Sequence, residues 1–303
     1  MNVIYAGGLC KSYGDKAAVD HLDMHVPQGA IYGFIGRNGS GKSTTLKLLC
    51  GLAAPTAGEI RLFGRPVEDP SARRRLGVLV EPAGIYPDKS AFENMMLKAC
   101  CFGIVSPAKE IETLLDMLGL DPKDRRRTRK YSMGMKQRLG IALALLGGPD
   151  MLILDEPING LDPEGMTRLR QALIALNKEK GMTMIISSHI LGELEKVATC
   201  YGIIKDGRMV SEVSADALEE KCRDYLCVRV DDARSAAVLL EEKLGIKNYE
   251  VHPEGEIRIF GPADSPGVCS ALAGAGIALE AVYMHRQDLE DYFLELMGGA
   301  DND

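Results

Sequence analysis

Four short, largely apolar stretches stand out along this chain, at residues 31–35, 77–81, 151–154 and 182–187, of which the second ends in Glu81. Unbroken apolar stretches, as opposed to an alternation with polar residues, are typical of strands that are buried on both faces. Apolar residues at helical spacing lie between them, for example over residues 44–50 and after Ser132, a plausible helix N-cap. This order of strands and helices predicts an α/β fold with a parallel sheet.

The remaining pattern predicts smaller elements around that sheet. Residues 3–5 and 17–26 favour short strands, and residues 59–64 alternate as a strand does. Residues 90–120 show two apolar faces at helical spacing and predict an inserted helical region. Residues 201–213 predict a hairpin around an Asp-Gly turn.

The character of the chain changes near residue 222. Strand patterns at 225–230, 247–252, 256–260 and 277–283 are interrupted by helical patterns at 233–244 and 265–274. The pattern predicts two domains, residues 1–221 and 222–303. The second is a small α+β domain in which we find no catalytic motif.

Composition narrows the class of protein. The 303 residues are 46% hydrophobic and 26% charged, with a formal net charge of −7, which argues against a nucleic-acid partner. No uncharged apolar stretch reaches the ~18 residues needed to cross a bilayer, and no signal peptide is visible. Eight cysteines occur without a C-x-x-C pair, so we expect reduced thiols in a cytosolic protein and not a metal site.

The first buried strand runs into a glycine-rich stretch, residues 36–44, that fits the pattern G-x-x-x-x-G-K-[ST]. Glycines let the backbone approach a ligand closely, and amide groups at a helix N-terminus attract anions. The stretch therefore predicts a phosphate site, and a chance match in an ordinary turn is the alternative. The residues expected to bind the nucleotide are Gly36, Asn38, Gly39, Ser40, Gly41, Lys42, Ser43 and Thr44.

Polar residues at the ends of two other strands predict hydrolysis in addition to binding. Asp155 suits a Mg²⁺ ligand together with the Ser43 hydroxyl, and Glu156 suits the general base. His189 could hydrogen-bond the γ-phosphate and hold Glu156 in line. The alternatives are that Glu156 is a surface carboxylate at the end of a strand and that His189 is a histidine without a function. Tyr13 could stack on a nucleobase or serve as an ordinary packing residue.

Taken together, these motifs resemble the nucleotide-binding subunit of an ABC transporter over about residues 1–220. The resemblance rests on six features in family order: Tyr13, the loop at 36–44, Ser132-x-Gly134, residues 152–157, residues 160–162 and residues 187–189. It implies the cassette version of the P-loop NTPase fold, a mixed sheet with an antiparallel β subdomain and a helical subdomain. It also implies ATP and Mg²⁺ as cofactors and a peripheral position on the inner face of the cell membrane.

The resemblance further implies two protein partners, a second copy of the chain and a separate transmembrane permease. In the family, two cassettes form a head-to-tail dimer, and each ATP lies between one phosphate loop and the partner's signature helix. On that basis Ser132 and Gly134 would bind the nucleotide of the partner copy. We expect no nucleic-acid partner.

Two departures from the family pattern concern the site itself. The signature reads Ser-Met-Gly-Met from Ser132, which keeps the hydroxyl and one glycine, and Glu81 replaces a glutamine that usually contacts the metal. A carboxylate at 81 can still ligate Mg²⁺. Both variants resemble the branch that includes exporters of the bacitracin and lantibiotic type.

Two other classes of function remain open at this stage. The first is an ABC ATPase that moves no substrate. Members of this class that act in DNA repair have a long insertion or zinc cysteines, and those that act on the ribosome usually have two cassettes, and this chain has none of these features. A nucleotide-binding regulator without turnover is the other, and Glu156 with His189 argues against it.

Overall fold

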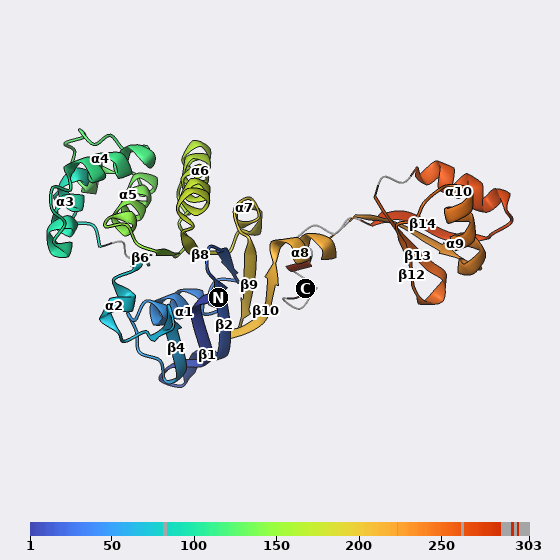
Figure 1. Ribbon diagram of the computed structural model, residues 1–303, viewed down its shortest axis with the longest axis horizontal. Helices are drawn as coiled ribbons and strands as arrows, with labels where there is room; N and C mark the ends of the chain where they lie inside the picture. Colours follow the sequence, from blue (N-terminus) through green and yellow to red (C-terminus); the bar gives the residue numbers. More distant parts are fainter. Residues whose placement is uncertain (81–83, 223, 262–263, 286–291, 294–295, 297–303) are drawn as a thin grey trace. The chain divides into compact units, whose positions relative to one another are not determined.

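The computed structural model describes residues 1–80, 84–222, 224–261, 264–285, 292–293 and 296. Contacts within the chain divide it into two compact units, Met1–Ala215 and Asp216–Asp303, here called unit 1 and unit 2 (Figure 1).

Unit 1 is built around a six-stranded sheet with the order β10-β9-β3-β8-β7-β6. β3 pairs in parallel with β8 and β9, β7 lies parallel between β8 and β6, and β10 closes the edge as an antiparallel hairpin with β9. All residues of β3, β7 and β8 are buried, which confirms the buried strands expected from the apolar stretches. The strands are β3 (Ile31–Ile35), β6 (Leu76–Leu79), β7 (Met151–Leu154), β8 (Thr183–Ser188), β9 (Cys200–Lys205) and β10 (Arg208–Ser214).

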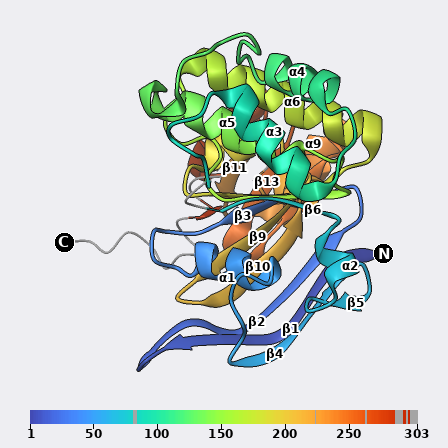
Figure 2. The same cartoon turned by 90° about the vertical axis from the view of Figure 1, so that its left-hand side faces the viewer.

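A second, antiparallel sheet covers one side of this core, with helix α1 (Lys42–Leu49) packed between the two sheets (Figure 2). Its order is β2-β1-β4-β5, formed by β1 (Asn2–Tyr13), β2 (Lys16–Pro27), β4 (Ala57–Leu62) and β5 (Arg65–Pro66). β1 is far longer than the strand expected at residues 3–5, whereas β2 nearly matches the strand expected at residues 17–26. Their exposed and buried residues alternate over most of their length, because only one face is covered.

Helices cover the opposite side of the six-stranded sheet (Figure 1). The expected helical region at 90–120 consists of two helices, because Gly103 ends the first in a left-handed conformation. Ser90 and Glu93 cap the start of that helix reciprocally. The helices on this side are α3 (Ala91–Phe102), α4 (Ala108–Met117), the 3₁₀ turn Thr128–Lys130, α5 (Met133–Leu145), α6 (Pro163–Lys180) and α7 (Leu191–Leu194). α3 and α4 pack on α5, whereas the short helix α2 (Pro70–Arg73) packs with the antiparallel sheet.

Unit 2 begins within α8 (Ala215–Lys221) and has a four-stranded antiparallel sheet with the order β12-β13-β11-β14. Helices α9 and α10 pack on one face of it, where Leu226, Val228 and Leu240 belong to a separate hydrophobic core. The succession β-α-β-β-α-β with this strand order is the ferredoxin-like arrangement. Its elements are β11 (Tyr225–Val230), α9 (Ala233–Glu242), β12 (Tyr249–Val251), the 3₁₀ turn Pro253–Gly255, β13 (Glu256–Phe260), α10 (Ser265–Gly274) and β14 (Leu279–His285).

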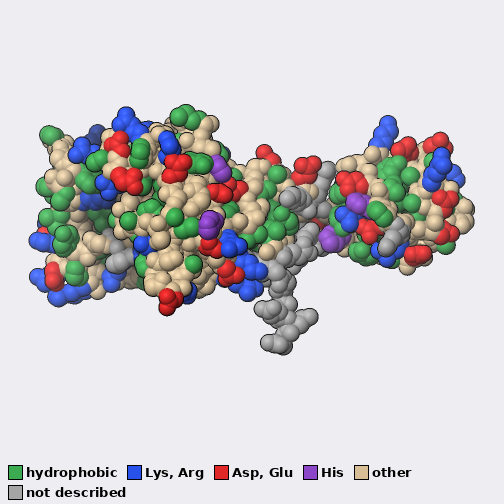
Figure 3. All heavy atoms as spheres, turned by 90° about the horizontal axis from the view of Figure 1, so that it is seen from below, with side chains coloured by type: hydrophobic (Ala, Val, Ile, Leu, Met, Phe, Trp, Pro, Cys, Tyr) green, Lys and Arg blue, Asp and Glu red, His purple; other side chains and the backbone are tan. Residues whose placement is uncertain are grey.

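The helices and the surface charges of the described residues bear on possible partners. No helix among them has the length and apolar composition needed to cross a bilayer. On the face drawn in Figure 3, the Lys and Arg side chains of the described residues are interspersed with Asp and Glu instead of forming one continuous basic stripe.

Candidate functional site

The carboxyl ends of three neighbouring strands, β3, β8 and β7, bring the expected site residues to one edge of the sheet. Parallel pairing aligns Phe34 with Ser187 and Leu154 with Ile186. The residues that follow each strand therefore meet, as is usual for ligand sites in parallel sheets. Glu81, the expected metal ligand beyond β6, lies outside the described residues.

The loop between β3 and α1 has the backbone geometry that its glycines predict. Gly39 and Gly41 have φ angles of 83° and 108°, which other residues rarely adopt. A Cβ at Gly36 would lie 2.5 Å from the Ile204 carbonyl, and one at Gly41 would lie 2.5 Å from the Ala18 carbonyl. The loop therefore depends on glycine for its shape and leaves the first amides of α1 directed at its concavity.

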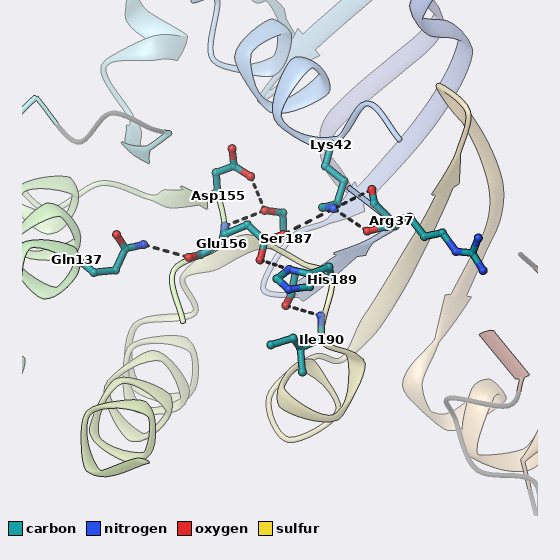
Figure 4. Close-up of polar contacts among 10 residues, drawn as sticks. Arg37, Lys42, Gln137, Asp155, Glu156, Ser187, His189 and Ile190 are labelled. Carbon is teal, nitrogen blue, oxygen red and sulfur yellow. Dashed lines mark hydrogen bonds and ion pairs between the residues drawn. The ribbon is translucent and has the colours of Figure 1, made fainter. Parts of the chain in front are cut away.

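Lys42 crosses the loop from the start of α1 and is only 6% exposed. Its Nζ donates to the carbonyl of Gly36 at 2.6 Å and to that of Arg37 at 3.3 Å, and it lies 3.6 Å from Glu156 Oε1 (Figure 4). Burial lowers the pKa of this ammonium group, while Glu156 and Asp155 oppose that shift. The site thus holds a nearly buried cation among carbonyls, in position for a phosphate oxygen.

The two acids after β7 are fixed by one buried hydroxyl. Ser187 Oγ donates to Asp155 Oδ1 at 2.6 Å and accepts from the backbone N–H of Glu156 at 2.9 Å. Asp155 is almost fully buried, and its own N–H donates to the Leu79 carbonyl at 2.8 Å. Ser187 therefore orients both acids through the strand that neighbours theirs.

Glu156 has a left-handed backbone with φ 47°, which is strained for a residue that is not glycine. Its Oε2 lies 3.0 Å from His189 Nδ1 and its Oε1 faces Lys42, as Figure 4 shows. The side chain is 16% exposed. The strain is therefore stored where a partly buried carboxylate lies between a lysine and a histidine.

The residues present fit a nucleotide with a divalent cation. Ser40 Oγ is buried in the loop without a hydrogen-bond partner among the described residues, and so it is available to a ligand. Ser43 is exposed at the first turn of α1. A hydroxyl and the Asp155 carboxylate are oxygen donors of the kind that Mg²⁺ prefers. Among the remaining loop positions, Asn38 is exposed and Thr44 is half-buried.

Three expected nucleotide-binding residues lie away from this cluster. Tyr13 is 54% exposed at the end of β1, with Lys11 Nζ 5.1 Å from its ring centroid. Ser132 is exposed and caps α5 by accepting from the Met135 N–H at 3.2 Å, which confirms the expected N-cap. Ser132 and Gly134 form no hydrogen bond with the loop of their own chain in the part that the structure describes.

Two residues that hold the acids in place carried no functional assignment from sequence. Ser187 was expected only as the end of a buried strand and as the first residue of the 187–189 feature, and Gln137 only as part of a helix start. No local signal marked Gln137, which stands between Lys136 and Arg138. Neither partner is near in sequence, because Gln137 and Glu156 are 19 residues apart and Ser187 and Glu156 are 31 apart.

Comparison with known proteins gives clear relatives. The family profile described as "ABC transporter" matches residues 19–159. The chain is 42% identical to the bacitracin transport ATP-binding protein BcrA of Bacillus licheniformis, over 98% of both chains. It is also 42% identical to the lantibiotic transport ATP-binding protein SrtF of Streptococcus pyogenes, over 70% of this chain and 90% of that protein.

Solved structures agree with the fold. A dimeric post-hydrolysis state of the ATP-binding cassette MJ0796, bound to ADP and Pi, superposes with a TM-score of 0.64 at 25% identity. It covers 70% of this chain and 98% of that one. The ATP-binding subunit of an ABC transporter superposes with a TM-score of 0.65 at 28% identity, over 72% of this chain and 92% of that one.

Proposed function

This chain belongs to the ABC transporter family as an ATP-binding subunit with ATPase activity, and from that premise we propose that it powers an exporter of peptide antimicrobials. The relatives whose names specify bacitracin or lantibiotic transport support this substrate class. The resemblance to the bacitracin relative extends over nearly the whole chain, including unit 2.

The observation that carries the catalytic proposal is the position of Glu156 between Lys42 and His189. In the proposed reaction, the Glu156 carboxylate accepts a proton from water as the water oxygen bonds to the γ-phosphorus and the bond to the ADP oxygen breaks. Lys42 and the loop amides stabilise negative charge on the phosphate oxygens, and His189 keeps the carboxylate in place.

We assign the metal to Ser43 and Asp155, together with Glu81. Bound Mg²⁺ would neutralise charge on the β- and γ-phosphate oxygens. Asp155 is held for such a role by the hydrogen bond from Ser187, which leaves its second oxygen available to a ligand. Tyr13, exposed at the end of β1, supplies a ring face for the base.

We propose that the working unit is a homodimer in which Ser132 and Gly134 complete the ATP site of the partner copy. Both lie at the start of α5, where the helix N-terminus favours an anion. The relatives solved as dimers of the cassette support this assembly.

A separate permease would dock on unit 1 on the cytoplasmic side of the membrane. A cavity of about 720 Å³ lies where α2 and β6 meet α3, lined by Arg73, Arg74, Leu76 and Phe102 among others. Phe102 is 58% exposed, which is unusual for so large an apolar side chain and suits a surface that a partner covers. The cavity also adjoins β6, the strand that leads toward Glu81.

The proposal is tested by separating binding from turnover. Glu156→Gln keeps the shape of the side chain, so we expect normal binding of ATP and a loss of turnover of about 10²–10⁴-fold. Lys42→Ala removes the buried cation, so ATP binding itself should weaken. Fluorescent-nucleotide titration and phosphate release measure the two effects. Near-normal turnover of Glu156→Gln would contradict its role as the base.

A further inference from the structure

Gln137 connects the helix that begins at the signature residues to the catalytic turn of the same chain. It lies in α5, one turn after Gly134, and is 8% exposed. Its Nε2 donates to the backbone carbonyl of Glu156 at 3.1 Å, and Figure 4 shows the side chain pointing from α5 to the turn after β7. A buried amide that makes this contact is a specific attachment between two elements.

The peptide groups on both sides of Glu156 are held in this way. The N–H donates to Ser187 Oγ on β8, and the carbonyl accepts from Gln137 and from the Asn159 N–H at 3.2 Å. The bond from Asn159 closes the turn upon itself. Gln137 therefore supplies the hydrogen bond that fixes this turn to α5.

The left-handed conformation of Glu156 needs such support. A strained backbone angle persists only where its surroundings over-determine it. Without Gln137 the carbonyl keeps only the Asn159 N–H of its own turn, and the turn is no longer tied to α5. Rotation of Glu156 toward a negative φ would then relieve the strain and move the carboxylate away from Lys42 and His189. Gln137 thus influences the direction of the Glu156 carboxylate, although it contacts only the backbone carbonyl of that residue.

The start of α5 packs closely on the same turn. A Cβ at Gly134 would lie 2.8 Å from the Gly160 carbonyl, so helix and turn touch there without an intervening side chain. α5 is thus in contact with the turn at residues 156–161 through packing at Gly134 and through the hydrogen bond of Gln137.

We propose that Gln137 is a positioning residue for ATP hydrolysis, whose amide holds the backbone of Glu156 so that its carboxylate faces the reacting water. It acts through Glu156 and has no contact with the substrate in this scheme. The inference rests on the proposed role of Glu156 as the general base. It adds a dependence of that base on α5, the helix that begins at Ser132.

The first experiment removes the hydrogen-bond donor while keeping the length of the side chain. Gln137→Met and Gln137→Glu both lack the N–H that reaches Glu156, and Gln171→Glu on the exposed face of α6 is the matched control. We expect kcat to fall about tenfold in both Gln137 variants, since small displacements of a reacting group are costly, with the Kd for ATP within about twofold. The control should keep both values. An unchanged kcat in both variants, or a loss of ATP binding in both, overturns the proposal.

The second experiment asks whether the effect passes through the carboxylate. Single-turnover hydrolysis is compared for Gln137→Met in the wild-type chain and in the Glu156→Gln chain. A residue that acts through Glu156 should have little further effect, within about twofold, once the carboxylate is gone. An equal loss in both backgrounds indicates a general structural role and overturns the proposal. Near-normal turnover in Glu156→Gln alone refutes the base assignment, and the positioning role with it.

Discussion

At the scale of single residues, the site combines a strained backbone with nearly buried charges. Glu156 has a positive φ, and its neighbour in space, Lys42, is held by the carbonyls of Gly36 and Arg37. Such outliers collect at functional sites because the strain is compensated by the surrounding structure. At position 156 the backbone would accommodate glycine more easily, and we therefore infer that the carboxylate of Glu156 has a function.

Replacement of Glu156 by two small residues measures this strain. Glu156→Gly and Glu156→Ala lose the same carboxylate, but glycine accepts a φ of 47° and alanine does not. We expect the glycine variant to have a free energy of unfolding about 1 kcal/mol higher than the alanine variant in urea titrations. At the exposed Glu112 in the middle of α4 the order should reverse, because glycine disfavours a helix. The same order at both positions would contradict a strained Glu156.

At the scale of elements, sequence patterns located the core of the site but not what fixes it. The apolar stretches gave β3, β7 and β8, and since parallel strands end at one edge, Lys42, Glu156 and His189 could be expected to converge. Contacts between distant side chains and backbone, such as those of Ser187 and Gln137, depend on how α5 and β8 pack. No local pattern encodes that packing.

The length of a strand is also only partly predictable from the local sequence pattern. β1 extends over twelve residues where the sequence pattern favoured a strand at residues 3–5, while β2 is close to its expected range. Irregularities in register between them interrupt the alternation of apolar residues, so the pattern along the chain breaks while the pairing continues. In unit 2, by contrast, β11 and α10 match the expected ranges. The pairing of β11 with β13 has no shift in register, and α10 has a proline in its first turn.

The packing of α5 on the turn after β7 can be tested at Gly134. Alanine there would place a methyl group 2.8 Å from the Gly160 carbonyl, a backbone atom that cannot move aside cheaply. We expect Gly134→Ala to lower the free energy of unfolding by about 1–3 kcal/mol. Gly192→Ala in α7 is the control, because its added Cβ would meet nothing within 4 Å. A Gly134→Ala protein as stable as the control would show that this contact is loose.

At the scale of the whole molecule, every described site residue belongs to unit 1, and unit 2 has a core of its own. This division suits our proposal that residues 222–303 form an accessory domain next to a cassette of residues 1–221. A domain of that size is only marginally stable alone, so the informative experiment removes it and examines the remainder.

A chain that ends after Cys222 keeps α8 and all of unit 1, so we expect it to fold and to bind ATP with the affinity of the full chain.

In the Glu156→Gln background, light scattering then compares the mass of both chains with and without Mg-ATP. ATP should convert the full chain from monomer to dimer, because phosphate charge and the start of α5 meet only when nucleotide is bound. Ser132→Arg, which places a bulky cation at that helix start, is the control and should block the conversion. Dimerisation retained after truncation would assign unit 2 to the permease or a regulator, and dimerisation lost would assign it to the interface between copies. If the truncated chain folds yet cannot bind ATP, unit 2 completes the nucleotide site and the two-domain proposal is wrong.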